Sequence, residues 1–196
     1  MSRRALVVAI LLLVAGALAR FVGRVPDDEM APSLLPGDLI LVLPLAATEG
    51  DVVAVVDPLA SARWTLRRVE AIGGAARYDG RVFRTSNRPK TRLLDMGRYR
   101  DRPVHLEGPH LVLRALEPTE KVTPEVGIPD DAAYLGADNR DDALDSRWWG
   151  PVPLTALRGV VVARLGLPTT PWRGWFGARG EAAVVPQSSR LGPPAS

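Results

Sequence analysis

The sequence predicts a mainly β protein. Along most of the chain, short segments of alternating apolar and polar residues, or of uninterrupted apolar residues, are separated by turn-forming residues. The 196 residues include 18 Gly and 18 Pro, a density that favours many turns and few long helices. A chain of this length suits one compact domain with appendages.

The N-terminal segment departs from this pattern and predicts a helix. Two arginines, Arg3 and Arg4, precede an apolar run that extends to Val22 if Arg20 is included. A helix of about 18 residues is roughly 27 Å long, just short of a hydrocarbon core of about 30 Å. On the residues alone, the segment is either a cleaved signal peptide or a permanent membrane anchor at residues 5–22.

Several further segments predict strands. The run Val52–Val56 is apolar throughout, which indicates a strand buried on both faces. Residues 85–103 show no clear period and predict a loop-rich insertion, whereas residues 177–196 are rich in Gly, Pro and Ser and predict a disordered tail. The strand-like segments are Leu39–Leu43, Val52–Val56, Trp64–Ile72, a hairpin at Tyr78–Phe83, His105–Leu116 and Leu157–Leu165.

The composition argues against several kinds of site. The chain has no Cys, so disulfides and cysteine metal sites are excluded, and two His residues are too few to favour a histidine zinc site. These two residues, His105 and His110, are interpreted as surface or strand-face residues. The net charge is only +3, and no basic run is interleaved with aromatic residues, so we expect no nucleic-acid partner. We predict no cofactor and no metal.

The stretch from Asp27 to Asp38 organises the rest of the chain. Pro32 and Pro36 each fix φ and remove a backbone donor, which predicts a rigid turn and not a helix. The end of the stretch, Pro36-Gly37-Asp38, is a turn signal that opens onto an apolar strand. The pattern therefore predicts a stiff loop with an acidic cluster, feeding a buried strand.

Three segments resemble motifs of the signal peptidase I family. Met30 to Asp38 resembles the family segment that follows the nucleophilic Ser, but Glu29 stands at the nucleophile position. Arg67-Arg68-Val69 resembles the segment that begins with the general-base Lys, and Arg67 stands at the position of that Lys. The third segment, Asp138 to Gly150, matches at several positions, although Ala137 and Ala143 replace a Gly and the Ser that hydrogen-bonds the Lys.

The resemblance implies a fold, a location and a set of supporting residues. It implies an antiparallel β core at residues 23–176 with a smaller inserted cap at about 75–130. One transmembrane helix at 5–22 would anchor this extracytoplasmic domain in the plasma membrane, with residues 1–4 in the cytoplasm, since Arg3 and Arg4 favour that side. The supporting positions are Asp27, Met30, Pro32, Arg68, Asp138, Asn139, Arg140, Ala143, Asp145, Ser146 and Arg147.

The family reaction is the removal of signal peptides from exported preproteins, and this chain lacks the groups that perform it. The family uses a Ser hydroxyl as the nucleophile and a neutral Lys as the base. Glu29 has no hydroxyl, and Arg67 stays protonated at physiological pH. Asp27 stands where the family has a small oxyanion-hole donor, and its charge would repel the developing anion. We therefore predict a catalytically inactive homologue in which Glu29 and Arg67 form an ion pair.

Other interpretations stay open on the sequence. The protein could be an active peptidase with a rearranged site, or a secreted binding module. Ser33 is a weak candidate for a replacement nucleophile, because no Lys or His motif lies near it in the sequence. A metal site at Asp27, Asp28 and Glu29 is less favoured than a solvated acidic loop, because three consecutive carboxylates do not converge on one ion. The expected partners are the membrane and either exported preproteins or an active signal peptidase. For Asp145 and Arg147, a bidentate ion pair is the structural interpretation.

Overall fold

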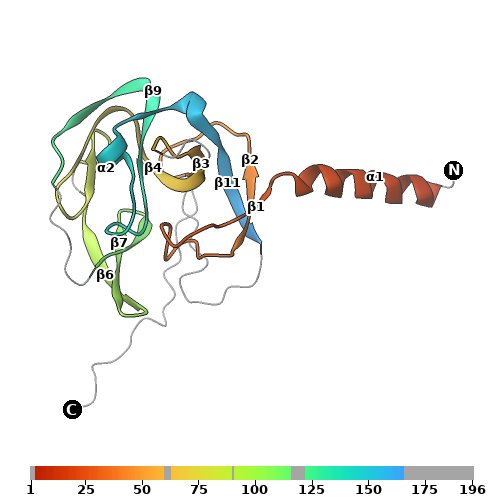
Figure 1. Ribbon diagram of the computed structural model, residues 1–196, viewed down its shortest axis with the longest axis horizontal. Helices are drawn as coiled ribbons and strands as arrows, with labels where there is room; N and C mark the ends of the chain where they lie inside the picture. The colour runs from red at the N-terminus through yellow and green to blue at the C-terminus, as the bar shows by residue number, and fades with distance from the viewer. Residues whose placement is uncertain (1–2, 60–62, 90, 116–121, 166–196) are drawn as a thin grey trace, which may run out of the picture.

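The fold is mainly β, as predicted, and its strands pair in antiparallel fashion (Figure 1). The computed structural model describes residues 3–59, 63–89, 91–115 and 122–165, so the predicted tail at 177–196 lies outside the described residues. The elements are α1 (Arg3–Ala19), β1 (Val22–Arg24), β2 (Leu39–Leu43), β3 (Val52–Val56), β4 (Trp64–Tyr78), β5 (Phe83–Thr85), β6 (Leu93–Tyr99), β7 (Arg102–Glu107), β8 (His110–Leu113), β9 (Val126–Gly136), α2 (Ser146–Trp149), β10 (Val152–Pro153), a 3₁₀ turn (Leu154–Ala156) and β11 (Leu157–Leu165).

The main sheet has eight strands in the order β1-β2-β11-β3-β4-β9-β10, with β5 paired to β4. The apolar run β3 lies in the middle of this order, between β11 and β4, and its first four residues are buried, as its pattern predicts. The last strand of the main sheet, β11, pairs with both β2 and β3. It therefore joins the strand that follows the Asp27–Asp38 loop to the centre of the sheet.

A second sheet, β6-β7-β8, lies in sequence between β4 and β9, within the region predicted as the inserted cap. The prediction of a loop-rich insertion at 85–103 was wrong for β6 and for the first residues of β7. The sequence of β6 shows no two-residue period, because Leu94 is exposed and the pairing with β7 shifts register between Asp95 and Arg98. An irregular register breaks the two-residue period on which strand prediction depends.

Strand β4 is longer than predicted, and β9 was not predicted at all. The β4–β9 ladder continues past Ile72, with one register shift between Val69 and Ala71 and another between Ile72 and Gly74, and Gly73 and Gly74 both have positive φ. Glycine adopts such backbone angles without strain, so the strand bends and continues where the sequence indicated its end. Strand β9 carries the exposed acidic pair Asp130-Asp131, which interrupts its apolar pattern.

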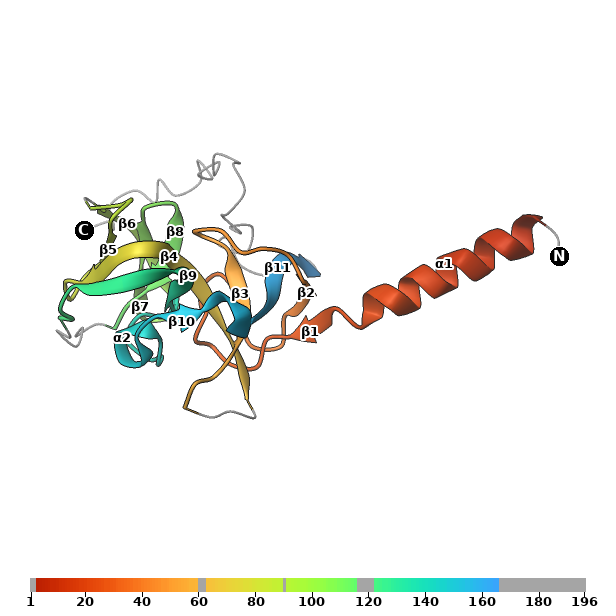
Figure 2. The ribbon, with the colours of Figure 1, turned by 90° about the horizontal axis from the view of Figure 1, so that it is seen from above.

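The N-terminal helix α1 projects away from the sheets (Figures 1 and 2). It ends at Ala19, so the predicted helical span of residues 5–22 was wrong at its C-terminal end. Val22 pairs with Leu41 in the β1–β2 ladder, and this pairing takes the chain out of the helix. Apolar side chains of α1 such as Leu6 and Ile10 are exposed. None of the helices in the described part of the chain has both the length and the apolarity needed to cross a membrane.

Candidate functional site

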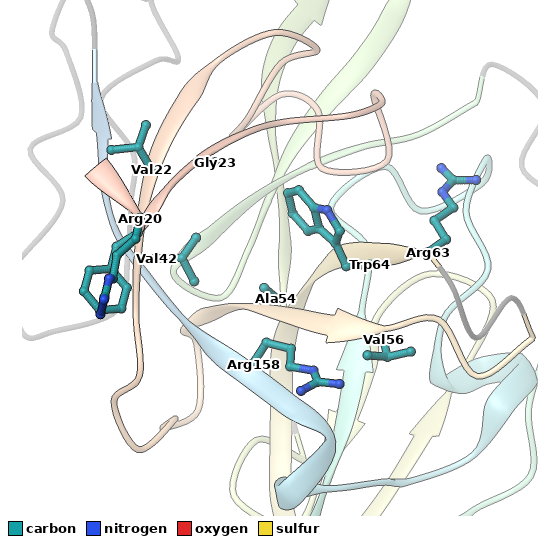
Figure 3. A pocket seen from close by; sticks show the side chains of 10 residues that line it. Arg20, Val22, Gly23, Val42, Ala54, Val56, Arg63, Trp64 and Arg158 are labelled. Atoms are coloured by element: carbon teal, nitrogen blue, oxygen red, sulfur yellow. The ribbon is translucent and has the colours of Figure 1, made fainter. Parts of the chain in front are cut away.

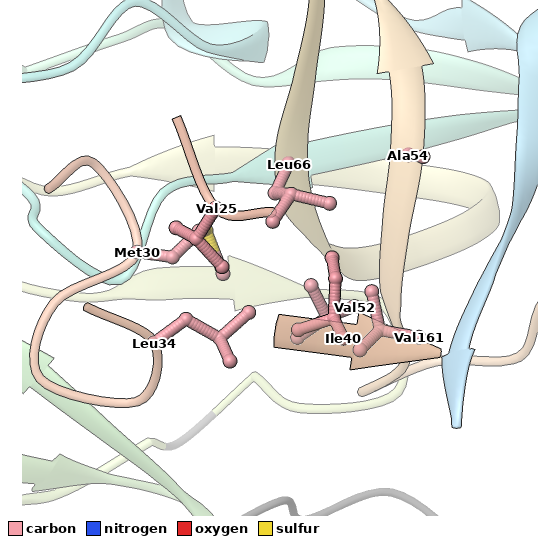
Figure 4. Close-up of a cluster of buried hydrophobic side chains, with 8 residues drawn as sticks. All are labelled: Val25, Met30, Leu34, Ile40, Val52, Ala54, Leu66 and Val161. Carbon is pink, nitrogen blue, oxygen red and sulfur yellow. The ribbon is translucent and has the colours of Figure 1, made fainter. Parts of the chain in front are cut away.

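The Asp27–Asp38 loop is held from both of its faces. Met30 and Leu34 are buried in an apolar cluster with residues of the main sheet, as Figure 4 shows. On the other face, Ala31 packs with Val104 and Leu113 of the second sheet. The loop thus lies between the two sheets, and burial of its apolar residues fixes the polar residues beside them. The cluster in Figure 4 comprises Val25, Met30, Leu34, Ile40, Val52, Ala54, Leu66 and Val161.

Hydrogen bonds inside the loop close it into a compact turn. The N–H of Val25 donates to the carbonyl of Asp38 at 2.8 Å, and the N–H of Gly37 donates back to Val25 at 2.9 Å. The Asp38 carboxylate accepts from the N–H of Leu35 at 2.9 Å, and Pro32 is buried. The predicted rigid turn is confirmed, with Gly37 at φ 86°, where glycine carries no side-chain strain.

The third motif holds the backbone of the loop in place. The N–H of Asn139 donates to the carbonyl of Glu29 at 2.9 Å, and its side-chain amide donates to the carbonyl of Asp28 at 3.2 Å. The neighbouring residues Asp138 and Arg140 bond to Leu113 at the end of β8. Residues far apart in the sequence therefore fix the position from which the Glu29 side chain extends.

Glu29 and Arg67 form the predicted ion pair. Arg67 Nη1 lies 2.8 Å from Glu29 Oε2, and the Arg67 side chain is only 1% exposed while that of Glu29 is 19% exposed. The hydroxyl of Thr65 donates to the same Glu29 oxygen at 3.0 Å and accepts from Arg67 Nη1 at 2.7 Å. One cation and one hydroxyl thus hold the carboxylate at the edge of the buried region.

The remaining guanidinium donors of Arg67 bond to backbone carbonyls. Nε and Nη2 donate to the carbonyl of Leu144 at 3.0 and 2.6 Å, and Nη1 donates to that of Leu66 at 2.5 Å. The guanidinium carbon also lies 5.2 Å from the ring centroid of Trp149, in cation–π contact. The buried Ala143 precedes Leu144, so a backbone carbonyl binds Arg67 next to the position where the resemblance places a Ser hydroxyl.

Asp27 is engaged in an ion pair of its own. Its Oδ2 lies 2.6 Å from Nη2 of Arg63, and its Oδ1 accepts from the N–H of Glu29 at 3.2 Å. The three consecutive acidic residues do not converge, because Asp27 faces Arg63 and Glu29 faces Arg67. Among the residues that the structure describes, no cluster of His, Asp or Glu side chains could hold a metal ion.

Arg68 pairs with Asp138, the first residue of the third motif. It binds the Asp138 carboxylate with two hydrogen bonds of 2.8 and 2.6 Å and donates to the carbonyl of Gly50 at 2.7 Å. Its Nη2 also donates to the Ser33 hydroxyl at 3.4 Å. Ser33 is 2% exposed, so its hydroxyl lies in the buried scaffold and is not presented to solvent as an attacking group would be.

Asp145, Ser146 and Arg147 hold the short helix α2 against the main sheet. Asp145 is the N-cap of α2, and Arg147 binds its carboxylate with two hydrogen bonds of 2.8 Å, which confirms the expected bidentate pair. The N–H of Ala137 donates to Asp145 at 3.0 Å, and the N–H of Leu135 donates to the Ser146 hydroxyl at 2.9 Å. These residues have a structural role in the geometry observed.

A buried ionic network joins the two sheets behind the site. Arg140 lies 2.8 Å from Glu70 and 3.0 Å from Glu107, and all three side chains are at most 1% exposed. Burial opposes ionisation of Glu70, but the guanidinium groups of Arg140 and Arg88 lower the pKa of Glu70 to about 2. Burial raises the pKa of Glu107 despite the neighbouring Arg140. His110 is also buried here, and burial lowers the pKa of its ring well below the ordinary value, as do nearby arginines, so the ring is neutral at pH 7.

Gly136 has no room for a side chain beside this network. A Cβ at this position would lie 2.6 Å from Nη1 of Arg140, 2.7 Å from the ring of Phe83 and 2.9 Å from Glu70. We expect Gly136→Ala to lower the free energy of unfolding by about 2 kcal/mol, because the packed ionic groups must move. Gly127→Ala is the matched control in the same strand, since a Cβ there meets nothing within 4 Å. Urea unfolding of the two variants measures the difference, and equal stabilities would contradict the expected clash.

Three contacts of the site were not predicted from the sequence. Thr65, Leu144 and Trp149 all contact Arg67. Only the Thr65 contact could have been inferred from the sequence, because Thr65 stands two residues before Arg67 and therefore on the same face of the strand. The contact through Leu144 uses its backbone, which no side-chain pattern can reveal. His105 is partly buried on β7 and His110 is buried on β8, and neither contacts the ion pair by any described bond.

A pocket of about 470 Å³ opens between β1 and the start of β4 (Figure 3). We call it the β1 pocket. Its volume is within the range of small-molecule and peptide side-chain sites. Its lining combines apolar side chains with three arginines and one exposed tryptophan. The lining residues are Arg20, Phe21, Val22, Gly23, Val42, Ala54, Val56, Arg63, Trp64 and Arg158.

Comparison with known proteins identifies the family. Residues 2–166 match the profile of the family described as signal peptidase, peptidase S26, so the chain belongs to this signal peptidase family. None of the curated proteins matches the sequence. Among solved structures, the chain is similar to the crystal structure of a signal peptidase I from Enterococcus faecalis V583. The identity is 16% and the TM-score 0.41, and the match covers 61% of this chain and 100% of that one.

Proposed function

We propose that this protein is a membrane-bound signal peptidase homologue that binds extended segments of exported proteins without cleaving them. The observation that carries the proposal is the ion pair between Glu29 Oε2 and Arg67 Nη1 at 2.8 Å. By the family motifs, these two residues occupy the positions of the nucleophile and the general base. A site with this pair lacks both groups that amide hydrolysis by a Ser/Lys pair requires.

The chemistry cannot be rescued by the residues beside the pair. A guanidinium keeps its proton, and that of Arg67 already donates to Glu29, Thr65 and two backbone carbonyls. The Glu29 carboxylate accepts from Thr65 and Arg67 and has no hydroxyl that could attack an amide. Asp27 adds a second negative charge where an oxyanion would develop, which opposes the reaction electrostatically.

The β1 pocket supports the binding part of the proposal. Its lining does not include Glu29 or Arg67, so the ion pair leaves the pocket open. An extended segment beside β1 can use main-chain hydrogen bonds for affinity and side-chain contacts with Trp64 and Val56 for selectivity. The bound segment would come from an exported preprotein. The other proposed partner is an active signal peptidase, which would receive that segment.

Membrane attachment is proposed for α1, with its N-terminus in the cytoplasm and the β domain outside. The exposed apolar side chains of α1, such as Leu6 and Ile10, support this, because water-exposed apolar surface of that extent is unfavourable. Arg3 begins the helix and Arg20 follows it, and both favour the polar interface. Carbonate extraction of cell membranes, followed by N-terminal sequencing, separates an attached form from a secreted and cleaved one.

The function is tested by incubating a preprotein with the purified protein and measuring release of the signal peptide. We expect no release by the wild-type protein. The variant Glu29→Ser/Arg67→Lys/Ala143→Ser restores a hydroxyl, an amine and an orienting group, so we expect it to be the more active of the two. If the wild-type protein releases the signal peptide and Glu29→Ala abolishes that release, the protein is instead an active peptidase with a rearranged site.

A further inference from the structure

We infer that the β1 pocket selects an extended peptide segment that carries a carboxylate side chain. This inference rests on the proposed peptide-binding function and adds the chemical class of the bound segment. The pocket is bordered by strand edges, and it is lined by arginines from three separate parts of the chain, as Figure 3 shows. The strand edges indicate the main chain of the ligand, and the arginines indicate its carboxylate.

The arginines supply the charge that a carboxylate would meet. Arg20 follows α1, Arg63 precedes β4, and Arg158 lies on β11. Arg63 is paired with Asp27, whereas Arg20 and Arg158 take part in none of the ion pairs formed by the described residues. Two exposed arginine side chains at one pocket are therefore available for an incoming anionic group, and arginine binds carboxylates with well-directed hydrogen bonds.

The strand edges bordering the pocket favour a peptide as the source of that carboxylate. In the part of the chain that the structure describes, β1 pairs with β2 alone. Among the described residues, the first residues of β4, from Trp64 on, pair with β3 alone, because the pairing with β9 begins at Arg68. Unpaired strand edges bind extended chains by adding a strand, and such binding uses main-chain groups that a lipid or a free anion lacks.

The floor of the pocket fits an extended peptide in which small or apolar residues flank the acidic residue. Gly23 lies in the middle of β1, and a Cβ there would stand 3.7 Å from the ring of Trp64. The absence of that side chain keeps the space between β1 and β4 open. Val42, Ala54 and Val56 provide the apolar surface below, where apolar side chains of the ligand would be removed from water.

The experiment measures the binding of two labelled peptides to the full chain in detergent by fluorescence anisotropy. The acetylated probes are Ala-Val-Glu-Ala-Val-Ala and the same peptide with Gln in place of Glu. We expect the Glu peptide to bind about fivefold more tightly at low salt, which is the scale of an exposed charge pair reinforced by a second arginine. High salt should reduce this preference, because exposed charges are screened.

A double variant assigns the preference to the pocket. Arg20→Gln/Arg158→Gln should bind both peptides equally, while Arg92→Gln/Arg98→Gln changes the net charge by the same amount away from the pocket and should keep the preference. Equal binding of the two peptides to the wild type overturns the inference and leaves the peptide-binding function standing. If neither peptide binds, both the inference and the peptide-binding function are overturned. Peptide cleavage, read by mass spectrometry of the same samples, overturns only the proposed lack of activity.

Discussion

Replacing Arg140 with methionine is expected to lower the free energy of unfolding by about 4 kcal/mol. Arg140 is fully buried between Glu70 and Glu107 and also donates to the carbonyl of Ala137 at 2.7 Å. Glu70 retains Arg88 after the substitution, but Glu107 loses its only described cationic partner. Breaking a buried pair by removing one partner costs about 3–5 kcal/mol, because the remaining charge is buried without compensation.

Urea unfolding measures this loss, and two further variants identify its cause. Adding Glu107→Gln to Arg140→Met neutralises the stranded charge and should recover part of the stability. Arg98→Met is the matched control, since Arg98 is exposed on β6 and its loss should change stability by less than about 0.5 kcal/mol. If Glu107→Gln recovers nothing, the cost comes from lost packing of Arg140 against Phe83 and not from the stranded carboxylate.

The second large effect is expected at the ion pair itself. Glu29→Ala should lower the free energy of unfolding by about 3 kcal/mol, because it leaves the buried guanidinium of Arg67 without its counter-charge. The double variant Glu29→Ala/Arg67→Met should lose less than the single one. Methionine replaces the buried charge with an apolar chain that can still pack on Trp149.

Thermal or urea unfolding of the two variants tests this coupling. Asp28→Ala, at the neighbouring exposed position, serves as the control for general changes in the loop. A double variant that is weaker than Glu29→Ala alone would contradict the account, since it would show that the hydrogen bonds of Arg67 outweigh the stranded charge.

Much of the fold follows from local patterns that the structure keeps. The apolar run β3, the turn at Gly37 and the last strand β11 were each predicted from their residues, because a buried strand requires apolar side chains and a tight turn requires glycine. The pairing of Glu29 with Arg67 also followed from the motifs, since opposite charges at two facing positions are expected to pair.

The features that were missed depend on distant parts of the chain. Strand β9 contains Asp130 and Asp131 and is a strand because β4 pairs with it, not because of its own pattern. Strand β6 is likewise held by its ladder with β7. Around Arg67, the carbonyl of Leu144 and the ring of Trp149 come from a segment more than 70 residues away, and sequence spacing alone does not reveal such contacts.

The structural contacts around the ion pair are present, although the catalytic nucleophile and base are not. Asp138 still binds Arg68, Asp145 still caps α2, and Asn139 still holds the backbone of Glu29. These contacts hold the loop and α2 in place, whatever groups stand at positions 29 and 67.

The central claim is that this site cannot hydrolyse an amide bond, and a single-turnover measurement tests it most directly. The purified wild-type protein, in molar excess over a preprotein with a small-x-small cleavage site, is incubated at several pH values and the mixture is read by mass spectrometry. The account predicts only intact preprotein at every pH. Accumulation of the free signal peptide with the wild type, and its absence with Glu29→Ala, would contradict it.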